Sequence, residues 1–329
     1  MSWKKRLSTL LVCPLLLLGL LSGCSGSADT AGLYSESGDY LGTPSLVSIN
    51  GKEVPFTMFR YFYLNLKAEA DSGDDAYWTN NDDGAQTLLS STLSYLTWSG
   101  AIDQLAVENG ATLTEDEKAA ADKELAEMIE YYGGESEFNT ILENSYITLD
   151  DYKDIFYRNK VQNKLLKLLL GDAATQYVKE NYVTAKHILI KVEEGASDTT
   201  EQLQKAEDLL AQLQAGADFD TLMNENSEDT GLASYPDGYT FTTGEMVEEF
   251  EDAAFSLKEG EISGIVKTTH GYHIIKRMPL LWETVYADFS NYLSEELLNT
   301  FTEKVEAAEE ALSITYSDQF ELVTPISIR

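Results

Sequence analysis

The amino-acid sequence predicts an α+β protein in which a small antiparallel sheet with surrounding helices is inserted in a mostly helical domain. Three observations lead to this prediction. Apolar residues recur at helical spacing over 85–180, alternating strands and short amphipathic helices follow over 184–279, and helical spacing returns over 281–312. The 329 residues are enough for about two domains. We therefore expect the helical regions that flank the insert in the sequence to form one domain.

The composition argues against several classes of function. The chain carries 56 acidic and 23 basic residues, for a formal net charge of −33. Nucleic acids and anionic lipid surfaces attract basic patches, so neither is expected to be the main partner. The 2 cysteines, Cys13 and Cys24, are too few for a disulfide-rich fold or a four-cysteine zinc site. The sequence also lacks a phosphate-binding glycine-rich loop.

Residues 1–23 have the parts of a lipoprotein signal peptide. A basic start over 4–6 precedes an apolar stretch over 7–21, which is shorter than the ~20 residues that span a bilayer. Leu21-Ser-Gly-Cys24 resembles the bacterial lipobox. That resemblance implies cleavage before Cys24, diacylglycerol and palmitate on Cys24, and a location on the extracytoplasmic face of the cell membrane. The alternatives are a secretory signal with an incidental cysteine and an uncleaved anchor.

The start of the mature chain is expected to be a tether followed by a strand. Residues 24–44 are rich in Ser, Gly and Asp, which favours a flexible tether. The alternating pattern over 45–54 predicts a short strand with a turn at Asn50-Gly51. A helix is predicted to begin near Pro55 or Thr57.

Residues 71–84 are interpreted as a solvated acidic loop. A calcium-binding loop is the alternative. With Gly84 at its sixth position, Thr79 and Ser90 would stand at the first and twelfth positions, where calcium loops of this type carry acidic ligands. The spacing therefore favours the solvated loop.

Residues 45–181 are expected to form the N-terminal part of a helical, chaperone-like domain, which 280–329 complete with a C-terminal helix. Thr114-Glu-Asp-Glu117 has the sequence of a capping box and predicts a helix start, and Leu149-Asp150 predicts another. The apolar stripe over 281–312 needs a partner, which the N-terminal helices offer. We interpret these stripes as core; a partly exposed peptide-binding groove is the alternative.

The insert, residues 182–279, is predicted to be a separate small α+β domain. It contains all 3 histidines of the chain, His187, His270 and His273. The predicted elements are a strand over 184–192, a helix over 200–215, shorter helices near 219–223 and 250–257, and strands within 262–276 with a turn near His270-Gly271.

The insert resembles the parvulin family of peptidyl-prolyl isomerases. Seven pieces carry the resemblance, in the family's order and nearly at its spacing. They are Ala185-Lys-His-Ile-Leu-Ile190, Ala217-Asp-Phe-Asp-Thr-Leu222, Ser227-Glu-Asp229, Phe241-Thr-Thr-Gly-Glu-Met-Val247, Phe250-Glu-Asp-Ala-Ala-Phe-Ser-Leu257, Gly260-Glu-Ile-Ser263 and Thr268-Thr-His-Gly-Tyr-His-Ile-Ile275.

The resemblance implies a set of site residues. His187 and His273 match the family's paired histidines, and Asp229 lies where members carry Cys or Asp. These three are the expected catalytic residues. The expected substrate-binding residues, around the proline ring, are Phe241, Met246, Phe250 and Thr268.

Two positions depart from the family's pattern. Tyr235-Pro-Asp-Gly-Tyr239 replaces a glycine-rich piece, with a one-residue length change that affects the alignment of Asp229. His270 stands where Ser or Tyr is frequent, so its role is open.

The wider chain resembles the extracellular foldase lipoproteins of the PrsA type. Those have a lipobox, a helical region that begins with a strand like Val47-Ser-Ile-Asn-Gly51, a central parvulin domain and a returning C-terminal helix. This resemblance implies a foldase with chaperone activity whose partners are unfolded exported polypeptides that contain X–Pro bonds. Whether the chain acts alone or as a homodimer stays open.

The implied chemistry needs no nucleophile, metal or cofactor. Rotation about an X–Pro bond has a barrier of about 18–20 kcal/mol because resonance stiffens the C–N bond. The twisted amide has less charge separation, so an apolar pocket stabilises it relative to the planar one. The two histidines are expected to form a hydrogen-bonded pair that shapes the pocket. The alternatives are a structural pair without catalysis and a zinc site from His187, His270 and His273.

The same site leaves three classes of function open. An isomerase with a chaperone region is favoured by the intact site residues. A holdase that binds peptide without turnover is the alternative raised by the altered loop at 235–239. An adhesin or a substrate-binding lipoprotein is the third class, and it has no support beyond the lipobox. Phosphorylated substrates are disfavoured because the acidic loop Val192–Asp198 would repel them.

Overall fold

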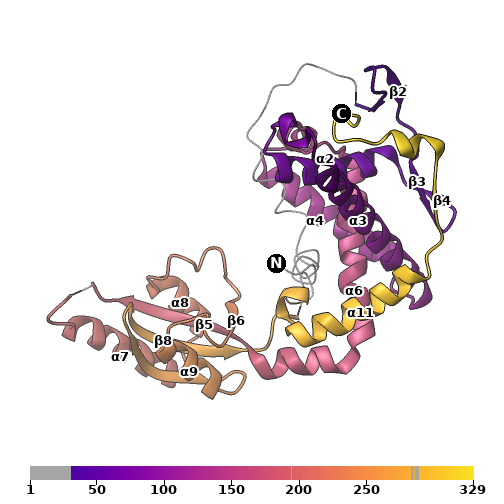
Figure 1. Ribbon diagram of the computed structural model, residues 1–329. Helices are drawn as coiled ribbons and strands as arrows, with labels where there is room; N and C mark the ends of the chain where they lie inside the picture. The colour runs from indigo at the N-terminus through magenta and orange to yellow at the C-terminus, as the bar shows by residue number, and fades with distance from the viewer. Residues whose placement is uncertain (1–30, 194, 283–284, 286–288) are drawn as a thin grey trace. The chain divides into compact units, whose positions relative to one another are not determined.

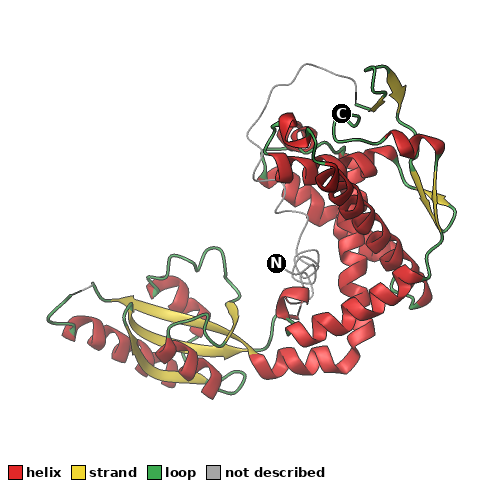
Figure 2. Ribbon diagram, in the orientation of Figure 1, coloured by secondary structure: helices red, strands yellow, loops and turns green. Residues whose placement is uncertain are grey.

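The structure is a computed structural model that describes residues 31–193, 195–282, 285 and 289–329. The chain forms two compact units (Figure 1). Among the described residues, the helical unit comprises those up to Gly171 together with Phe289–Arg329, and the sheet unit comprises those from Asp172 to Val285. Helices and small antiparallel sheets together confirm the α+β class (Figure 2). The predicted signal peptide, Cys24 and the first residues of the tether lie outside the described residues.

The helical unit is built from long helices whose starts follow local sequence signals. At the predicted capping box, the Glu117 N–H donates to Thr114 Oγ1 at 3.2 Å and the Thr114 N–H donates to Glu117 Oε2 at 2.7 Å. The helices are α2 (Phe56–Asp71), α3 (Asp82–Glu108), α4 (Glu115–Tyr131), α5 (Glu135–Asn144), α6 (Leu149–Asn181) and α11 (Glu295–Glu310), with 3₁₀ turns at η2 (Asp75–Trp78), η3 (Phe289–Tyr292) and η4 (Asp318–Leu322). The predicted starts near Pro55, Thr114 and Leu149 are confirmed.

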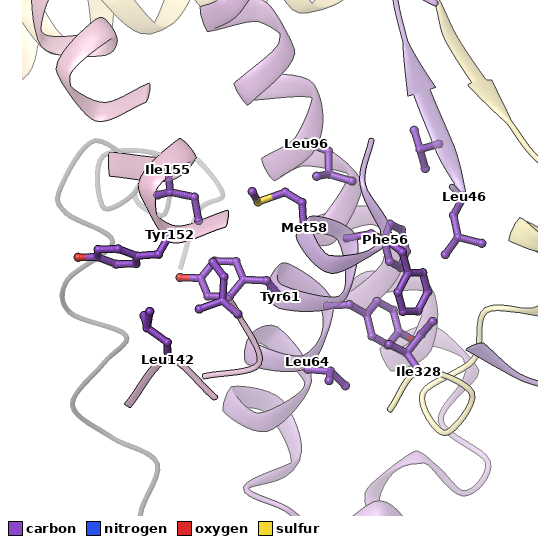
Figure 3. Packing of buried hydrophobic residues seen from close by; sticks show 14 of the residues in the cluster. Leu46, Phe56, Met58, Tyr61, Leu64, Leu96, Leu142, Tyr152, Ile155 and Ile328 are labelled. Atoms are coloured by element: carbon purple, nitrogen blue, oxygen red, sulfur yellow. The ribbon is translucent and has the colours of Figure 1, made fainter. Parts of the chain in front are cut away.

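The core of the helical unit lies around α2. Phe59 and Tyr63, one turn apart on that helix, are almost fully buried and stack with ring centroids 5.7 Å apart. Figure 3 shows neighbouring side chains of α2 among residues of α3, α5 and α6 and beside Ile328, close to the C-terminus. Distant segments of the sequence therefore contribute to one core.

Helix α11 packs along α3. Phe301 is fully buried, and its ring meets Trp98 edge-on with centroids 6.4 Å apart. Thr97 Oγ1 donates to Glu309 Oε1 at 2.7 Å. The returning apolar stripe thus finds its partner on the N-terminal helices, as the sequence predicts.

A small sheet joins the two ends of the helical unit. Its strand order is β4 (Lys52–Glu53), β3 (Val47–Ile49) and β9 (Ile314–Tyr316), all antiparallel. The β3–β4 turn has Asn50 at φ 51° and Gly51 at φ 75°, the conformation that Asn-Gly favours. This confirms the predicted turn and adds a C-terminal strand that the sequence analysis did not predict.

The prediction of a flexible tether is wrong for residues 31–44. Strands β1 (Leu33–Tyr34) and β2 (Tyr40–Gly42) form a hairpin, and Leu33 is fully buried. The Gly32 N–H donates to Arg329 O at 3.0 Å, and the Tyr34 N–H donates to Ser327 O at 2.8 Å. Pairing with the chain's last residues therefore orders a stretch whose composition alone favours flexibility.

The acidic loop is also more structured than expected. The side chain of Asp71 is only 1% exposed, and it accepts hydrogen bonds from Lys67 Nζ at 2.7 Å, Trp78 Nε1 at 2.6 Å and the Gly73 N–H at 2.8 Å. The loop between α2 and α3 therefore folds around a buried carboxylate, and the prediction of a fully solvated loop is wrong at this residue.

The sheet unit contains a four-stranded antiparallel sheet within its described residues. The strand order is β6 (Tyr239–Thr242), β5 (Tyr182–Lys191), β8 (Gly271–Met278) and β7 (Ile262–Thr268). Helices α7 (Thr200–Gln214) and α8 (Phe219–Asn226) cover one face, and α9 (Glu248–Ser256) covers the other (Figure 1). The predicted helices and strands of the insert are confirmed, and β6 is an additional strand.

The division between the units falls at Gly171, ten residues before the predicted boundary at 182. Gly171 has φ 55° and ψ −137°, so it interrupts the helical backbone of α6. The part of α6 after Gly171 belongs to the sheet unit. In the described part of the chain, no helix combines the length and the apolar character needed to cross a membrane.

Candidate active site

The predicted site residues gather on the sheet face that α9 covers. His187 lies on β5 and His273 on the adjacent strand β8, where His273 pairs in register with Leu189. Side chains alternate between faces along a strand, so both rings point to the same side. Their centroids are 5.2 Å apart and their planes nearly perpendicular, at 86°.

An aromatic floor lies against the two imidazoles. The Phe250 ring, on α9, meets His187 at a centroid distance of 5.1 Å and His273 at 5.4 Å, both edge-on. Phe241 on β6 extends the floor, with its ring 5.9 Å from that of Phe250. Both phenylalanines are at most 3% exposed, whereas Met246 is half-buried and packs at the edge of the same cluster. The floor is therefore apolar and rigid, with a reachable edge.

Thr268 fixes the second histidine. Its Oγ1 lies 2.9 Å from His273 Nε2 and accepts a hydrogen bond from the backbone N–H of His270 at 3.0 Å. The prediction that the two histidines are hydrogen-bonded to each other is wrong. Among the described residues, neither nitrogen of His187 and not the Nδ1 of His273 has a hydrogen-bond partner. The edge-on ring geometry explains why the two imidazoles meet without a direct hydrogen bond.

Asp229 reaches the site from the loop that follows α8. The Leu189 N–H donates to Ser227 Oγ at 3.1 Å and the Glu228 N–H donates to Leu189 O at 2.8 Å, which pins the start of this loop to β5 beyond His187. Asp229 Oδ2 then lies 3.4 Å from His187 Nε2, without hydrogen-bond geometry. The aligned position of Asp229, which the altered loop had put in question, is thus beside the histidines.

Tyr239 is a site residue that the sequence analysis missed. Its hydroxyl donates to Asp229 Oδ2 at 2.7 Å, and its ring stacks on His187 with centroids 5.9 Å apart and planes at 13°. The only signal in the sequence was the departure over 235–239, which marks the residue without giving its contacts.

The comparisons with known proteins agree with this geometry. Residues 187–279 match the family model of the PPIC-type PPIase domain, also described as rotamase. These residues form a parvulin-type peptidyl-prolyl isomerase domain. The parvulin resemblance of the sequence is confirmed over this range.

Longer matches extend beyond the parvulin domain. The chain is 37% identical to foldase protein PrsA of Oceanobacillus iheyensis over 177 residues, covering 52% of this chain and 54% of that one. It is 33% identical to foldase protein PrsA of Staphylococcus epidermidis over 206 residues, covering 60% of this chain and 61% of that one. A shorter match is the parvulin of Nitrosopumilus maritimus, whose solution structure has 37% sequence identity and a TM-score of 0.25. It covers 30% of this chain and 97% of that one. The chain thus spans between half and two thirds of the curated relatives' length.

Burial keeps His187 and His273 neutral near pH 7. It lowers the pKa of His187, against a smaller opposing effect of Asp229. It also lowers the pKa of His273 to about 3, assisted by the neighbouring His187 and His270. Burial alone would raise the pKa of Asp229, but hydrogen bonds from the Tyr239 hydroxyl and the Gly231 N–H, with the nearby charge of Lys191, hold it below the usual value. Burial and Asp229 raise the pKa of Tyr239. The site therefore combines two neutral imidazoles with a carboxylate and a protonated phenol.

The third histidine lies outside this cluster. His270 is exposed at the turn between β7 and β8 and reaches the site through its backbone N–H. Within the described ranges, no group of three or more His, Cys, Asp or Glu side chains is arranged to hold a metal ion.

Proposed function

We propose that this chain is a membrane-anchored extracytoplasmic foldase that catalyses cis/trans isomerisation of X–Pro bonds in exported polypeptides, with chaperone activity in its helical unit. The observation that carries the proposal is the apolar floor of Phe250, Phe241 and Met246 against two neutral, buried histidines. The named relatives are foldases, which supports the same role.

The geometry suits bond rotation rather than bond cleavage. The proline ring would rest on Met246 and Phe250, in surroundings of low polarity. A planar amide is stabilised in water by its charge separation, and an apolar surface removes that advantage, so the twisted state is favoured relative to the ground state. The neutral imidazoles add no charge that would favour the planar form. The Asp229 carboxylate beside His187 is already engaged by the Tyr239 hydroxyl and by the Gly231 N–H at 3.0 Å.

The test is isomerisation of a proline tetrapeptide series by the mature chain. Uncatalysed exchange takes tens to hundreds of seconds, so acceleration is easily measured. Met246→Ala should lower kcat/KM, because it removes the half-buried edge of the floor. The control is Leu210→Ala, which truncates a half-buried residue on the opposite face of the sheet. A folded chain that binds these peptides without accelerating exchange would replace this proposal by a holdase that only binds.

The proposed anchor has its own test. Cys24→Ala should abolish lipidation, and fractionation should then show the chain released or unprocessed. Membrane retention with unchanged processing would contradict a lipid anchor on Cys24.

A further inference from the structure

Tyr239 contacts two groups of the site that do not bond to each other, the Asp229 carboxylate and the His187 imidazole. Its hydroxyl holds the oxygen of Asp229, Oδ2, that lies 3.4 Å from His187 Nε2, while its ring lies parallel to the His187 ring. One side chain thus contacts both the carboxylate and the imidazole. Because Tyr239 lies on β6 and His187 on β5, neighbouring strands of one sheet fix this contact.

Gly231 makes room for this arrangement. A Cβ on Gly231 would lie 2.1 Å from the Tyr239 hydroxyl oxygen, far inside any tolerated contact, and 3.2 Å from the ring carbon that carries it. The N–H of the same glycine donates to Asp229 Oδ1 at 3.0 Å. The backbone of Gly231 is outside the left-handed region, so an alanine is compatible with its conformation, and the Tyr239 hydroxyl oxygen is the one atom that would lie closer than 3.0 Å to its Cβ.

The groups that face Asp229 come from every element around it. They are His187 and Lys191 on β5, Tyr239 on β6, His273 on β8, and the Gly231 N–H of its own loop. A carboxylate accepts hydrogen bonds and donates none. A neutral imidazole beside it is therefore favoured when the nearer nitrogen, Nε2, carries the proton.

We propose that Tyr239 is a positioning residue that holds Asp229 against His187 and thereby fixes the Nε2–H tautomer of His187. This inference rests on the proposed isomerase activity for its kinetic consequence, but the tautomer itself is a property of the resting chain. The remaining nitrogen of His187, Nδ1, then carries the lone pair. It is buried and without a hydrogen-bond partner among the described residues.

The experiment compares Tyr239→Phe, Gly231→Ala and the double variant in the full mature chain. Nitrogen-15 spectra of the histidine rings report tautomers directly, and only 3 histidines contribute signals. In Tyr239→Phe, the His187 shifts should move toward the average of two tautomers. The value of kcat/KM should fall roughly tenfold, the size expected for the loss of one hydrogen bond that orients a site residue. The acid limb of its pH profile should move up by about one pH unit, because Asp229 loses a hydrogen bond to its ionised form.

Gly231→Ala should have the same effects, because its Cβ displaces the Tyr239 hydroxyl. The double variant should match Tyr239→Phe alone, since the phenylalanine ring no longer presents an oxygen to the new methyl group. The control is Tyr272→Phe, which removes a hydroxyl bonded to Thr199 at 2.8 Å, on the other face of the sheet. It should leave the His187 spectrum unchanged.

Two results would overturn the inference. One is an unchanged His187 tautomer and pH profile in Tyr239→Phe. The other is a double variant whose losses add, because additive losses mean that Gly231 and Tyr239 act independently. A wild-type chain without isomerase activity would refute the proposed function instead, and the nitrogen-15 spectra would still decide the role of Tyr239.

Discussion

Protonation of His273 should destabilise the parvulin domain in mild acid. Its pKa is about 3 in the folded chain against 6.5 for the free side chain. Above pH ~6.5 the ring is neutral in both states and contributes nothing to the pH dependence. Below this pH, His273 binds a proton in the unfolded chain but stays neutral in the folded chain until about pH 3. The free energy of unfolding therefore falls by about 1.4 kcal/mol for each pH unit, or roughly 3 kcal/mol between about pH 6.5 and 4.5.

The assay is urea unfolding followed through the His187 ring signal, which reports only the sheet unit. The chain's many carboxylates also titrate in this range, so the informative quantity is the difference between wild type and His273→Gln. That variant should lose roughly 3 kcal/mol less than wild type over this interval. Equal slopes for His273→Gln and wild type, or a His273 ring that titrates near 6.5, would refute the reasoning.

Three further predictions concern packing. Phe250→Ala should lower the free energy of unfolding of the sheet unit by about 3–5 kcal/mol in urea, because the Phe250 side chain is 3% exposed and its removal leaves a cavity. Met246→Ala should lower it much less, because Met246 is half-buried. Equal losses for the two variants would contradict this reasoning. Asp71→Ala should lower the free energy of unfolding of the helical unit by about 3 kcal/mol, because Lys67 and the Trp78 N–H lose a buried acceptor. An unchanged free energy of unfolding in the same assay would show that the buried carboxylate does not stabilise the unit. A fragment of residues 45–180 should give poorly dispersed amide spectra until a 289–329 peptide is added, because it lacks the partner of Trp98 on α11; a stable monomeric fragment would show otherwise.

Local interactions explain which parts of the fold the sequence predicts. The capping box at Thr114 and the turn at Asn50-Gly51 are stabilised by residues within three positions of each other, so their signals are complete in a short stretch. The strands of the insert show the same locality in their alternating pattern. Such elements can be predicted without knowing what they pack against.

Residues 31–44 show why other parts could not be predicted. Their composition favours a flexible chain, and their order comes from hydrogen bonds between Gly32 and Arg329, at opposite ends of the described chain. The burial of Asp71 has a similar origin, because Trp78 supplies an indole N–H from the following turn. Composition describes what a segment can do alone, and these segments are fixed by partners that a local pattern does not contain.

The candidate site divides along the same line. The parvulin resemblance implied that His187 and His273 are a pair on adjacent strands, and the register of β5 with β8 places both side chains on one face. The orientation of the rings, and hence the absence of a direct hydrogen bond between them, depends on Thr268 and Phe250 packing from two other elements. The role of Tyr239 also depends on contacts from other elements, so the sequence alone did not predict it. It stands within a departure from the family's pattern, and its contact with Asp229 exists only because Gly231 lacks a side chain. The departure at Tyr239 is therefore better tested by substituting Tyr239 and Gly231 separately and together than by substituting Tyr239 alone.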